Sequence, residues 1–435
     1  MPSYRIWTVG CQMNVADSLK LAAGLDRLGF VEAAEDADAD LEVLNTCSVR
    51  QHAEDRAYGR LHQLRQDRSK GREFTLAVMG CMVGPRTTDL ERRFPWVDVW
   101  SQPQVFDPIL ERAGLMRDAS EGEFWTETFA VPNGVTAFVP VVHGCDKFCT
   151  YCIVPLRRGR ERSRPVDEIL REVRFLAERG VREVTLLGQT VEAYGHDLEG
   201  ADAGADLATL FEGIEAIDGI LRVRFLTSYP KDMTDRIIDA VASSSKVCEH
   251  FNIPVQSGDD AMLARMRRGY TLAEYEERVA RIRQVMPDVA LATDVIVGCP
   301  GETDEEFQHT VELLERTQFD VIHVAAYSPR PGTYAYRNLE DDVPREVKKA
   351  RLQVIEALHA ESSARINRAS LGQEVEVLVE REDEHGRSTG RTRRGQLVHF
   401  DGTGLVGQLA RVRIHEVTSW SLSGRLAGDL TLALV

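Results

Sequence analysis

The sequence of 435 residues lacks any apolar run long enough to span a membrane, and it contains no low-complexity tract. Residues 1–5 also lack the basic segment and apolar segment that begin a secretory signal peptide. Cysteine is scarce, with eight residues in the chain, which argues against a disulfide framework and favours thiols in a reducing compartment. We therefore expect a cytoplasmic protein with no membrane segment, whose cysteines bind metal.

Positive charge is also in short supply, because 53 Lys and Arg face 69 Asp and Glu, for a net charge of −16. Such a balance argues against diffuse binding of nucleic acid over the whole surface, but it permits a local basic site. One short stretch is rich in arginine: Arg157, Arg158, Arg160, Arg162 and Arg164. A solvated charged loop is the alternative, but its place directly after three cysteines favours a phosphate-binding site.

Those three cysteines, Cys145, Cys149 and Cys152, share one short loop with the spacing C-x3-C-x2-C. Three thiolates can hold three irons of a [4Fe–4S] cluster and leave the fourth iron open for a ligand. The alternative, a structural zinc site, needs four ligands, and His143 is the local candidate at a spacing unlike that of zinc fingers. The spacing matches the signature of radical S-adenosylmethionine (SAM) enzymes, with Tyr151 as the aromatic before the last cysteine.

The first hundred residues alternate between strand and helix patterns. Strands are predicted at 4–9, 41–44 and 74–79, and helices at 50–67 and from an N-cap at Asp17 to a stop at Gly29. This β-α-β-α-β order predicts a parallel, doubly wound sheet. Cys11, Cys47 and Cys81 each follow the carboxyl end of one strand, at the sheet edge where ligands bind. Each alone is explained as a buried, inert thiol, but together they predict a second cluster.

A linker is predicted at 121–132, and a second alternation follows it. Six strands are predicted at 137–142, 183–187, 222–226, 250–254, 291–297 and 321–326. Helices are predicted between them at about 167–179, 206–217, 234–242, 272–286 and 303–316. Such repetition predicts a complete or partial parallel barrel of the TIM type, with its chemistry at the carboxyl ends of the strands.

Several polar or glycine residues at these strand ends are candidates for holding SAM, although each is equally explained by turn formation. They are Gly188, Gln189, Ser228, Gln256, Ser257 and Gly298. The two remaining cysteines, Cys248 and Cys299, lie in apolar contexts and are assigned to the core.

The C-terminal part has a different composition. A helix at about 344–367 precedes short strand patterns at 374–379, 395–400, 408–415 and 421–427. Short antiparallel strands of this kind predict a small barrel related to oligonucleotide-binding folds. Arg391, Arg393 and Arg394 form its predicted basic patch for RNA. The alternative is a module for dimerisation or packing.

Nearly the whole chain resembles the methylthiotransferase family of radical SAM enzymes. The shared motifs are GCQMN at 10–14, NTCSVR at 45–50, GC at 80–81, IPVQSG at 253–258, GCPGET at 298–303 and YSPRPGT at 327–333. The resemblance implies an N-terminal domain with an auxiliary cluster over 1–120, a radical SAM core over 131–366 and an RNA-binding TRAM domain over 367–435.

The sequence Cys-Gln-Met-Asn at 11–14 is similar to the MiaB branch, which adds a methylthio group to C2 of N6-dimethylallyladenosine beside the tRNA anticodon. The resemblance implies two [4Fe–4S] clusters and SAM, both as methyl donor and as radical source. The six cysteines are then the catalytic ligands, with Tyr151 near SAM. Arg157, Arg158 and Arg160, together with the TRAM arginines, are the expected contacts to the anticodon stem-loop.

The resemblance further implies a flavodoxin or ferredoxin as electron donor and a monomer. Three alternatives remain open from the sequence. The substrate can instead be N6-threonylcarbamoyladenosine in tRNA. The protein can be a radical SAM enzyme that does not thiolate, or a non-catalytic iron–sulfur protein that binds RNA.

Overall fold

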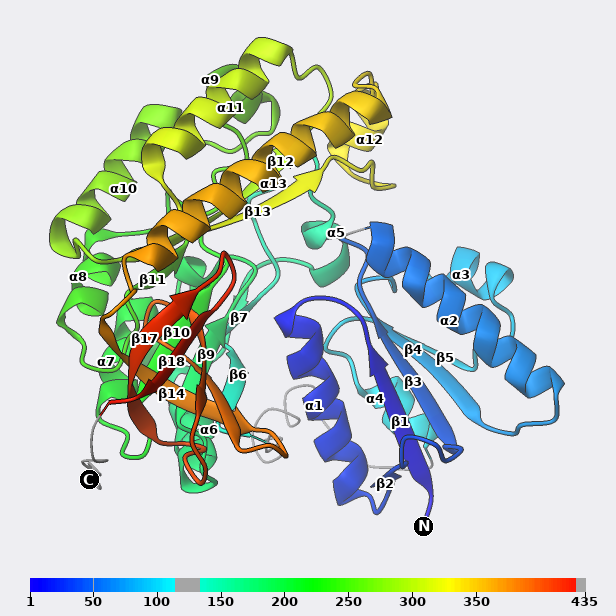
Figure 1. Ribbon diagram of the computed structural model, residues 1–435. Helices are drawn as coiled ribbons and strands as arrows, with labels where there is room; N and C mark the ends of the chain where they lie inside the picture. The colour runs from blue at the N-terminus through cyan, green and yellow to red at the C-terminus, as the bar shows by residue number, and fades with distance from the viewer. Residues whose placement is uncertain (50, 114–133, 428–435) are drawn as a thin grey trace.

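The computed structural model describes residues 1–49, 51–113 and 134–427, so the linker predicted at 121–132 lies outside the described residues. A parallel sheet, a partial barrel and a small closed barrel follow one another along the chain (Figure 1). None of the helices in the described ranges is long and apolar enough to cross a bilayer.

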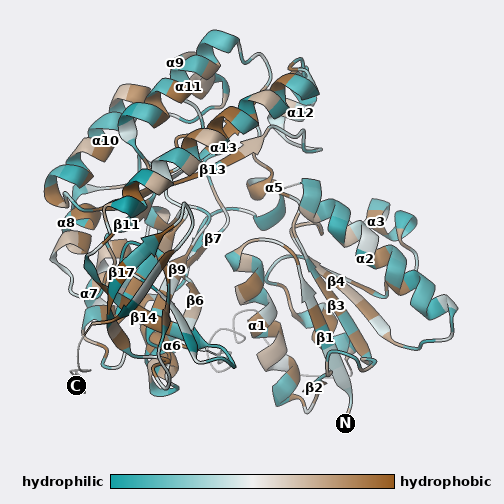
Figure 2. Ribbon diagram, in the orientation of Figure 1, coloured by the Kyte–Doolittle hydropathy of each residue, from teal (hydrophilic) through white to brown (hydrophobic). Residues whose placement is uncertain are grey.

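The N-terminal sheet has five parallel strands in the order β2-β1-β3-β4-β5. The strands are β1 (Ser3–Thr8), β2 (Val31–Glu32), β3 (Leu41–Thr46), β4 (Thr75–Gly80) and β5 (Val99–Ser101). Helices α1 (Gln12–Arg27) and α4 (Asp107–Arg112) pack on one face, and α2 (Gln51–Ser69) and α3 (Thr88–Arg93) pack on the other. This arrangement confirms the predicted doubly wound sheet. The solvent-facing α2 is largely hydrophilic (Figure 2).

One predicted helix start is wrong. Helix α1 begins at Gln12, with Cys11 as its N-cap, and Asp17 lies fully buried inside the helix. The reason is the short connection after β1, where only Val9 and Gly10 precede the cap. Asn14 supplies the cap contact, because its Oδ1 accepts a hydrogen bond from the Cys11 amide at 3.3 Å.

The central region contains six strands in two parallel sheets, β10-β9-β6 and β11-β12-β13. Their bounds are β6 (Thr136–Pro140), β9 (Glu183–Leu187), β10 (Arg222–Leu226), β11 (His250–Asn252), β12 (Ala290–Val297) and β13 (Val321–Ala326). The bridge between Val223 and Val247 brings the two sheets together beside β10 and β11. One apolar core lies beneath all six strands, and β6 and β13 are the outer strands of the two sheets, so the barrel in the described residues is partial.

Helices cover the outside of this partial barrel (Figure 1). They are α6 (Val166–Glu178), α7 (Leu207–Glu215), α8 (Asp235–Ser243), α10 (Leu272–Val285), α11 (Asp304–Thr317) and α13 (Arg345–Arg368). Two short helices, α9 (Asp260–Arg265) and α12 (Tyr334–Asn338), lie past the strand ends, where both contact Thr150. Smaller elements lie near the strand ends: β7 (Val142–His143), α5 (Val154–Arg158), β8 (Arg162–Ser163), η2 (Val191–Ala193) and η3 (Gly200–Asp202).

The C-terminal region is a closed barrel in the order β14-β15-β16-β18-β17. Its strands are β14 (Glu374–Glu382), β15 (Arg387–Arg391), β16 (Leu397–Asp401), β17 (Leu409–Val417) and β18 (Leu422–Leu426). The sequence predicts four of them and misses β15, because its sequence RSTGR contains no apolar residue. Strands β16 and β18 pair in parallel, so the predicted all-antiparallel pairing is wrong at this edge.

Buried arginines fix the closed barrel to the partial barrel. Arg222, with a side chain 1% exposed, donates to the carbonyl of Arg391 at 2.6 Å and pairs with Glu376 at 3.0 Å. Arg224 donates to the carbonyls of Thr392 and Arg393 at 2.7 and 2.9 Å. Arg224 also pairs with Glu183 of β9 at 3.0 Å, so its guanidinium links the core to the closed barrel, and the two barrels form a single packed body.

Candidate active site

Cys11, Cys47 and Cys81, here called the sheet-edge trio, meet beyond the carboxyl ends of β1, β3 and β4. Cys47 and Cys81 are buried, and Cys11 is exposed at the start of α1. Burial is the main cause that raises the pKa of Cys81 to about 12, and the neighbouring Cys47 and Cys11 contribute to the rise. A Cβ at Gly10, next to Cys11, would lie 3.0 Å from Cys47 Cβ, and the Cys81 amide donates to the Thr46 carbonyl, so the three cysteines are neighbours at one edge of the sheet.

Two asparagines and a glycine hold the sheet-edge trio in place. Asn14 Nδ2 donates to Asn45 Oδ1 at 2.9 Å, and Asn45 Nδ2 donates to the Asn14 carbonyl at 2.8 Å. Gly80 has φ +95°, and a Cβ there would lie 2.4 Å from the Thr46 carbonyl oxygen. The Cys81 amide donates to that same oxygen at 2.8 Å. The turn after β4 therefore requires glycine.

Cys145, Cys149 and Cys152, here called the loop trio, follow β7 on one continuous loop. The Cys145 amide donates to the Gly159 carbonyl at 3.2 Å, and the Cys152 amide donates to the Cys149 carbonyl at 3.0 Å. Cys145 Sγ lies 3.5 Å from Thr190 Oγ1, beyond the end of β9. The loop trio thus sits at the carboxyl ends of the barrel strands, as the fold predicts.

Arg268 supports the loop trio and is not predicted by the sequence analysis. Its buried guanidinium donates to Cys149 Sγ at 3.3 Å, to the Tyr151 hydroxyl at 3.5 Å and to the Pro254 carbonyl at 3.0 Å. Although burial lowers the pKa of Arg268, the facing Tyr151, Tyr270 and Cys149 raise it well above its ordinary value. An arginine beside Arg267 gives no sequence signal of such burial.

The cysteine side chains of the two trios suit iron–sulfur clusters better than a single metal ion. Within the described ranges, no three His, Cys, Asp or Glu side chains close around a single metal ion. In a cubane cluster each thiolate binds its own iron at a separate corner, which asks for a wider spacing than one ion does. Guanidinium donors reach a sulfur in both trios, Arg158 at Cys81 and Arg268 at Cys149, and such donors match thiolate ligands.

Arg158 requires a correction, because the sequence analysis assigns it to RNA. Its side chain is 2% exposed and pairs with the buried Asp17 at 3.2 Å, while Nε donates to Cys81 Sγ at 3.2 Å. A guanidinium so enclosed has no room for a phosphate. Arg158 follows the loop trio in the sequence, but its side chain therefore contacts the sheet-edge trio.

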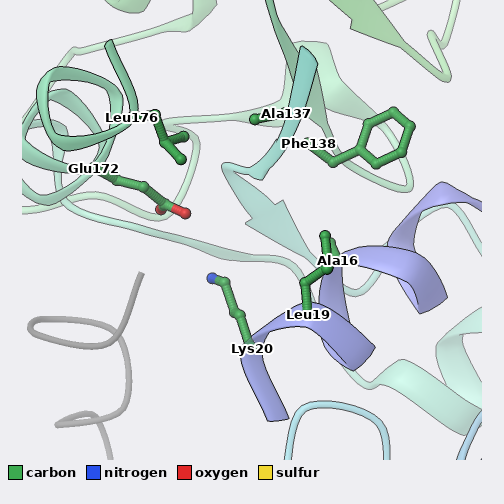
Figure 3. Close-up of a pocket in the computed structure, with 7 residues that line it drawn as sticks. All are labelled: Ala16, Leu19, Lys20, Ala137, Phe138, Glu172 and Leu176. Carbon is green, nitrogen blue, oxygen red and sulfur yellow. The ribbon is translucent and has the colours of Figure 1, made fainter. Parts of the chain in front are cut away.

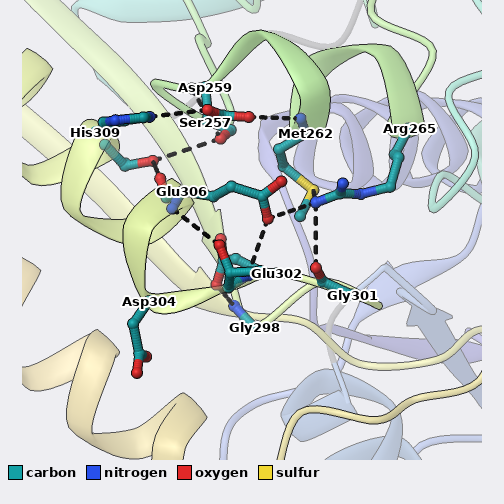
Figure 4. A network of polar contacts seen from close by, with 12 residues as sticks. Ser257, Asp259, Met262, Arg265, Gly298, Gly301, Glu302, Asp304, Glu306 and His309 are labelled. Atoms are coloured by element: carbon teal, nitrogen blue, oxygen red, sulfur yellow. Dashed lines mark hydrogen bonds and ion pairs between the residues drawn. The ribbon is translucent and has the colours of Figure 1, made fainter.

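Two of the SAM candidates are engaged within the protein (Figure 4). The Gly298 amide donates to Glu302 Oε2 at 2.5 Å, and Ser257 Oγ lies 3.4 Å from Thr310 Oγ1. The surrounding pairs, Arg265 with Glu306 and Asp259 with His309, fix the loops that follow β11 and β12. Gly188 is a packing position, where a Cβ would lie 2.6 Å from Val142 Cγ1.

The remaining SAM candidates offer polar atoms. Among the described residues, Gln189 Oε1 and Gln256 Oε1 are buried without a hydrogen-bond partner. Gln256 also has φ +73°, a strained conformation for a residue other than glycine. Ser228 is buried beside Glu192, whose pKa burial raises to about 8. Unsatisfied polar atoms beside the loop trio fit a polar, charged cofactor such as SAM.

Sequence profiles of known families match three parts of the chain. They are the uncharacterized protein family UPF0004 over residues 3–102, the radical SAM superfamily over 139–314 and the TRAM domain over 368–427. A tRNA-2-methylthio-N(6)-dimethylallyladenosine synthase of Dehalococcoides mccartyi is 45% identical over 433 residues, 99% of this chain and 100% of the relative. One of Roseiflexus is 46% identical over 440 residues, 99% of this chain and 91% of the relative.

The chain belongs to the tRNA-2-methylthio-N(6)-dimethylallyladenosine synthase family.

Solved structures share the fold of this family member at low identity. The radical SAM methyltransferase TsrM of Kitasatospora setae, solved with cobalamin and a [4Fe–4S] cluster, has a TM-score of 0.55 at 15% identity and covers 77% of each chain. The cobalamin-dependent radical SAM enzyme OxsB, solved with aqua-cobalamin and SAM, has a TM-score of 0.53 at 12% identity, covering 82% of this chain and 56% of its own. These likenesses confirm the expected combination of a parallel sheet and a radical SAM barrel.

The other arginines assigned to RNA in this synthase-family chain differ in exposure. Arg160 is exposed and pairs with Asp146 at 2.8 Å, and Arg391 is partly exposed beside Glu380. Arg393 pairs with Glu249 at 2.8 Å, and Arg394 pairs with Asp320 at 2.5 Å. These last two contacts join the TRAM barrel to the core, so the packing alternative describes Arg393 and Arg394 better than RNA binding does.

The synthase-family N-terminal domain also contacts the core through α1. Ala16, Leu19 and Lys20 of α1 face β6 and α6 across a small pocket of ≈ 20 Å³, where the Lys20 ammonium points toward Glu172 (Figure 3). Burial lowers the pKa of Lys20 to about 7, and Glu172 opposes that shift. On the other side, Arg330 donates to Gln51 and Glu54 of α2 at 3.0 and 3.1 Å. Together these contacts hold the sheet edge toward the barrel mouth.

Proposed function

We propose that this protein transfers a methylthio group to C2 of N6-dimethylallyladenosine beside the anticodon of tRNA. The observation that carries the proposal is the contact of Arg158, which ends the short helix α5 just after the loop trio, with Cys81 of the sheet-edge trio in the other domain. The full-length similarity to synthases of that name supports the substrate. Such a reaction needs both activation of a carbon–hydrogen bond and a source of sulfur, and two separate clusters match these two tasks.

The proposed cofactors are SAM and two [4Fe–4S] clusters. Cys145, Cys149 and Cys152 would hold the cluster that binds SAM, and the sheet-edge trio would hold the auxiliary cluster. When bound, SAM and its cluster supply the radical chemistry that a carbon–hydrogen bond without acidic character demands. Gln189 and Gln256 would orient the polar groups of SAM, because their buried oxygens have no partner within the described residues.

The chain's own residues also shape the site. Tyr151 packs against the Arg268 guanidinium, which fixes the last turn of the cysteine loop. Glu192 is 1% exposed, and its raised pKa of about 8 keeps the carboxyl protonated at neutral pH. Its Oε2 accepts a hydrogen bond from the Tyr229 amide at 3.1 Å, which holds the loop after β10 against η2. Val191, Ala193 and Tyr194 on either side of Glu192 are fully buried, so this segment is packed into the core.

The proposed RNA surface combines the exposed Arg160 of the cysteine region with the outer face of the TRAM barrel. Arg413 and Arg425 are paired neighbours on β17 and β18, and both side chains are exposed. Trp420, 66% exposed, lies in the turn between these strands. Cationic side chains beside an exposed aromatic ring suit single-stranded bases of an anticodon loop. These residues take the place of Arg393 and Arg394 in the predicted patch.

Three further parts of the proposal concern the cellular setting. The protein works as a monomer in the cytoplasm and receives electrons from a flavodoxin or ferredoxin. The thiols and clusters require a reducing compartment, which supports that placement.

The deciding experiment is mass spectrometry of tRNA nucleosides after anaerobic incubation of the cluster-loaded protein with SAM and a reductant. One tRNA would carry dimethylallyladenosine and another would carry threonylcarbamoyladenosine. A methylthio gain on the first alone is expected. A gain on the second alone would move the activity to the other nucleoside, and SAM cleavage with no gain on either would overturn the substrate.

A further inference from the structure

We propose that Arg158 is a positioning residue for the auxiliary cluster. Its guanidinium donates a hydrogen bond to the Cys81 thiolate and places a positive charge beside it. This contact makes the cluster on the sheet-edge trio easier to reduce. The inference rests on the proposed function, because it assumes that the sheet-edge trio binds a [4Fe–4S] cluster.

The contact joins two distant parts of the chain. Arg158 ends α5 in the radical SAM core, and Cys81 follows β4 in the N-terminal domain. Its Nε lies 3.2 Å from Cys81 Sγ, and its Nη2 lies 3.2 Å from Asp17 Oδ2. The Arg158 and Asp17 side chains are 2% and 0% exposed, so the contact is shielded from water.

The neighbouring residues show that α5 is built to fit this place. A Cβ at Gly84 would lie 2.1 Å from Arg157 Nη1, so glycine leaves room for the preceding arginine against the turn after β4. On the core side, a Cβ at Gly332 would lie 3.2 Å from Leu156 Cδ1. The end of α5 is therefore enclosed from both domains, and Arg158 has a defined position against Cys81.

Asp17 explains why the arginine keeps this orientation. Its side chain is fully buried, and its Oδ2 accepts a hydrogen bond from Arg158 Nη2 at 3.2 Å. A buried carboxylate and guanidinium that face each other strongly restrict each other's rotamers. With Nη2 held by Asp17, the Nε–H group is directed to Cys81 Sγ.

The physical consequence is electrostatic. Reduction adds one negative charge to a cluster, and a nearby cation stabilises that charge most strongly where water is excluded. Hydrogen bonds to the ligand sulfurs act in the same direction, because they also favour the electron-rich form. Arg158 supplies both, so its removal is expected to make reduction of the auxiliary cluster harder.

A purely structural role is the competing explanation, because Arg158 with Asp17 also joins the two domains. Activity and stability measurements do not separate these roles, since either role predicts a loss. The midpoint potential of the auxiliary cluster does separate them. If Arg158 only held the two domains together, its substitution would leave the midpoint potential of an assembled cluster unchanged.

The test uses the full chain with Cys145→Ala, Cys149→Ala and Cys152→Ala, so that only the sheet-edge trio binds iron. The midpoint potential would be measured by redox titration followed by electron paramagnetic resonance. Arg158→Met, Arg158→Lys and the control Arg162→Met would each be added to this triple variant. Arg162 is an exposed arginine of β8, and no contact joins it to the sheet-edge trio in the described residues.

We expect Arg158→Met to shift the potential to more negative values and Arg158→Lys to shift it less, because lysine keeps the charge and loses the Nε donor. Arg162→Met should match the triple variant. If Arg158→Met does not fold, Arg158→Lys still carries the comparison.

Unchanged potentials in a loaded Arg158→Met or Arg158→Lys protein would overturn the inference alone. A triple variant that binds no iron would overturn the cluster assignment and the inference with it.

Discussion

The loop trio is held by one continuous segment, whereas the sheet-edge trio is assembled from the ends of three strands. In the first, backbone hydrogen bonds of the loop itself and the guanidinium of Arg268 set the positions of the thiols. In the second, the parallel register of β1, β3 and β4 sets them, and Arg158 arrives from another domain. A local spacing therefore defines one site, and the tertiary fold defines the other.

The difference predicts how each site responds to damage. The loop trio depends on the sequence between Gly144 and Gly159 and on the barrel strands below it. The sheet-edge trio depends on the whole N-terminal sheet and on its docking to α5. Substitutions chosen in the two regions should therefore separate the two clusters.

The largest effect should come from removing one cysteine of each trio. Cys145→Ala should abolish SAM cleavage, because the cluster that binds SAM loses a ligand. Cys47→Ala should retain SAM cleavage and lose methylthiolation. Both are measured by chromatography of 5′-deoxyadenosine alongside mass spectrometry of the tRNA. Cys248→Ala, in the buried core, is the matched control with both activities intact. Methylthiolation by Cys47→Ala would contradict the division of labour.

Gly80→Ala should selectively damage the sheet-edge trio. The residue has φ +95°, and the new Cβ would lie 2.4 Å from the Thr46 carbonyl oxygen, so the turn that carries Cys81 must move. The strain is on the order of 1–3 kcal/mol. We expect about half of the bound iron to be lost while SAM cleavage continues, as iron analysis and 5′-deoxyadenosine formation would measure.

Gly71→Ala is the control for this test, because Gly71 has a similar φ of +97° and a Cβ added there would meet no atom within 4 Å. It should keep its full complement of iron. Equal iron loss in both variants would attribute the effect to backbone strain in general and contradict a special role of the turn after β4.

Arg268→Met should affect the loop trio and spare the sheet-edge trio. The change removes donors to Cys149, Tyr151 and Pro254, at a cost of roughly 1–3 kcal/mol in the free energy of unfolding. A reduced rate of SAM cleavage, with an unaltered signal from the auxiliary cluster, is the expected result. Arg267→Met removes the exposed neighbouring arginine and should change neither. Loss of the auxiliary signal would show that the two sites are not independent.

The smallest expected effect is on the pH dependence of the stability of the radical SAM core, which carries the loop trio. Burial, with Arg224, His323 and Arg394 nearby, lowers the pKa of His250 to about 3. The unfolded chain then binds more protons between about pH 6.5 and pH 3, so stability falls as the pH drops through that window. At pH 5 the loss from this residue is roughly 2 kcal/mol.

His250→Leu should therefore flatten the pH dependence of the unfolding midpoint between pH 7 and pH 5, as denaturant titrations would measure. A variant with the same slope as the parent protein would contradict the low pKa. Loss of sheet-edge iron at pH 5 before any change in the core would contradict the assignment of this pH dependence to the core.

The sequence predicts the loop trio fully, because its ligands lie within eight residues of one loop. It predicts the sheet-edge trio through topology, because three cysteines follow three strands of one parallel sheet. It does not predict the partners of these thiols. From the sequence, Asp17 is interpreted as an N-cap and Arg158 as part of an exposed loop. Only the structure shows that the two side chains form a buried pair. Strand β15 is not predicted from the sequence, because all its residues are polar or glycine.

The docking of the TRAM barrel has a consequence for how this architecture changes in evolution. Arg222 and Arg224 lie in strand β10 of the core, and their guanidinium groups end on carbonyl oxygens of residues 391–393. In a lineage that loses the barrel, both arginines would lose the carbonyl oxygens that accept their hydrogen bonds. Arg224 would keep Glu183 of β9, whereas Arg222 would lose both Glu376 and the Arg391 carbonyl, so position 222 in related genes should be the one that varies with the presence or absence of the barrel.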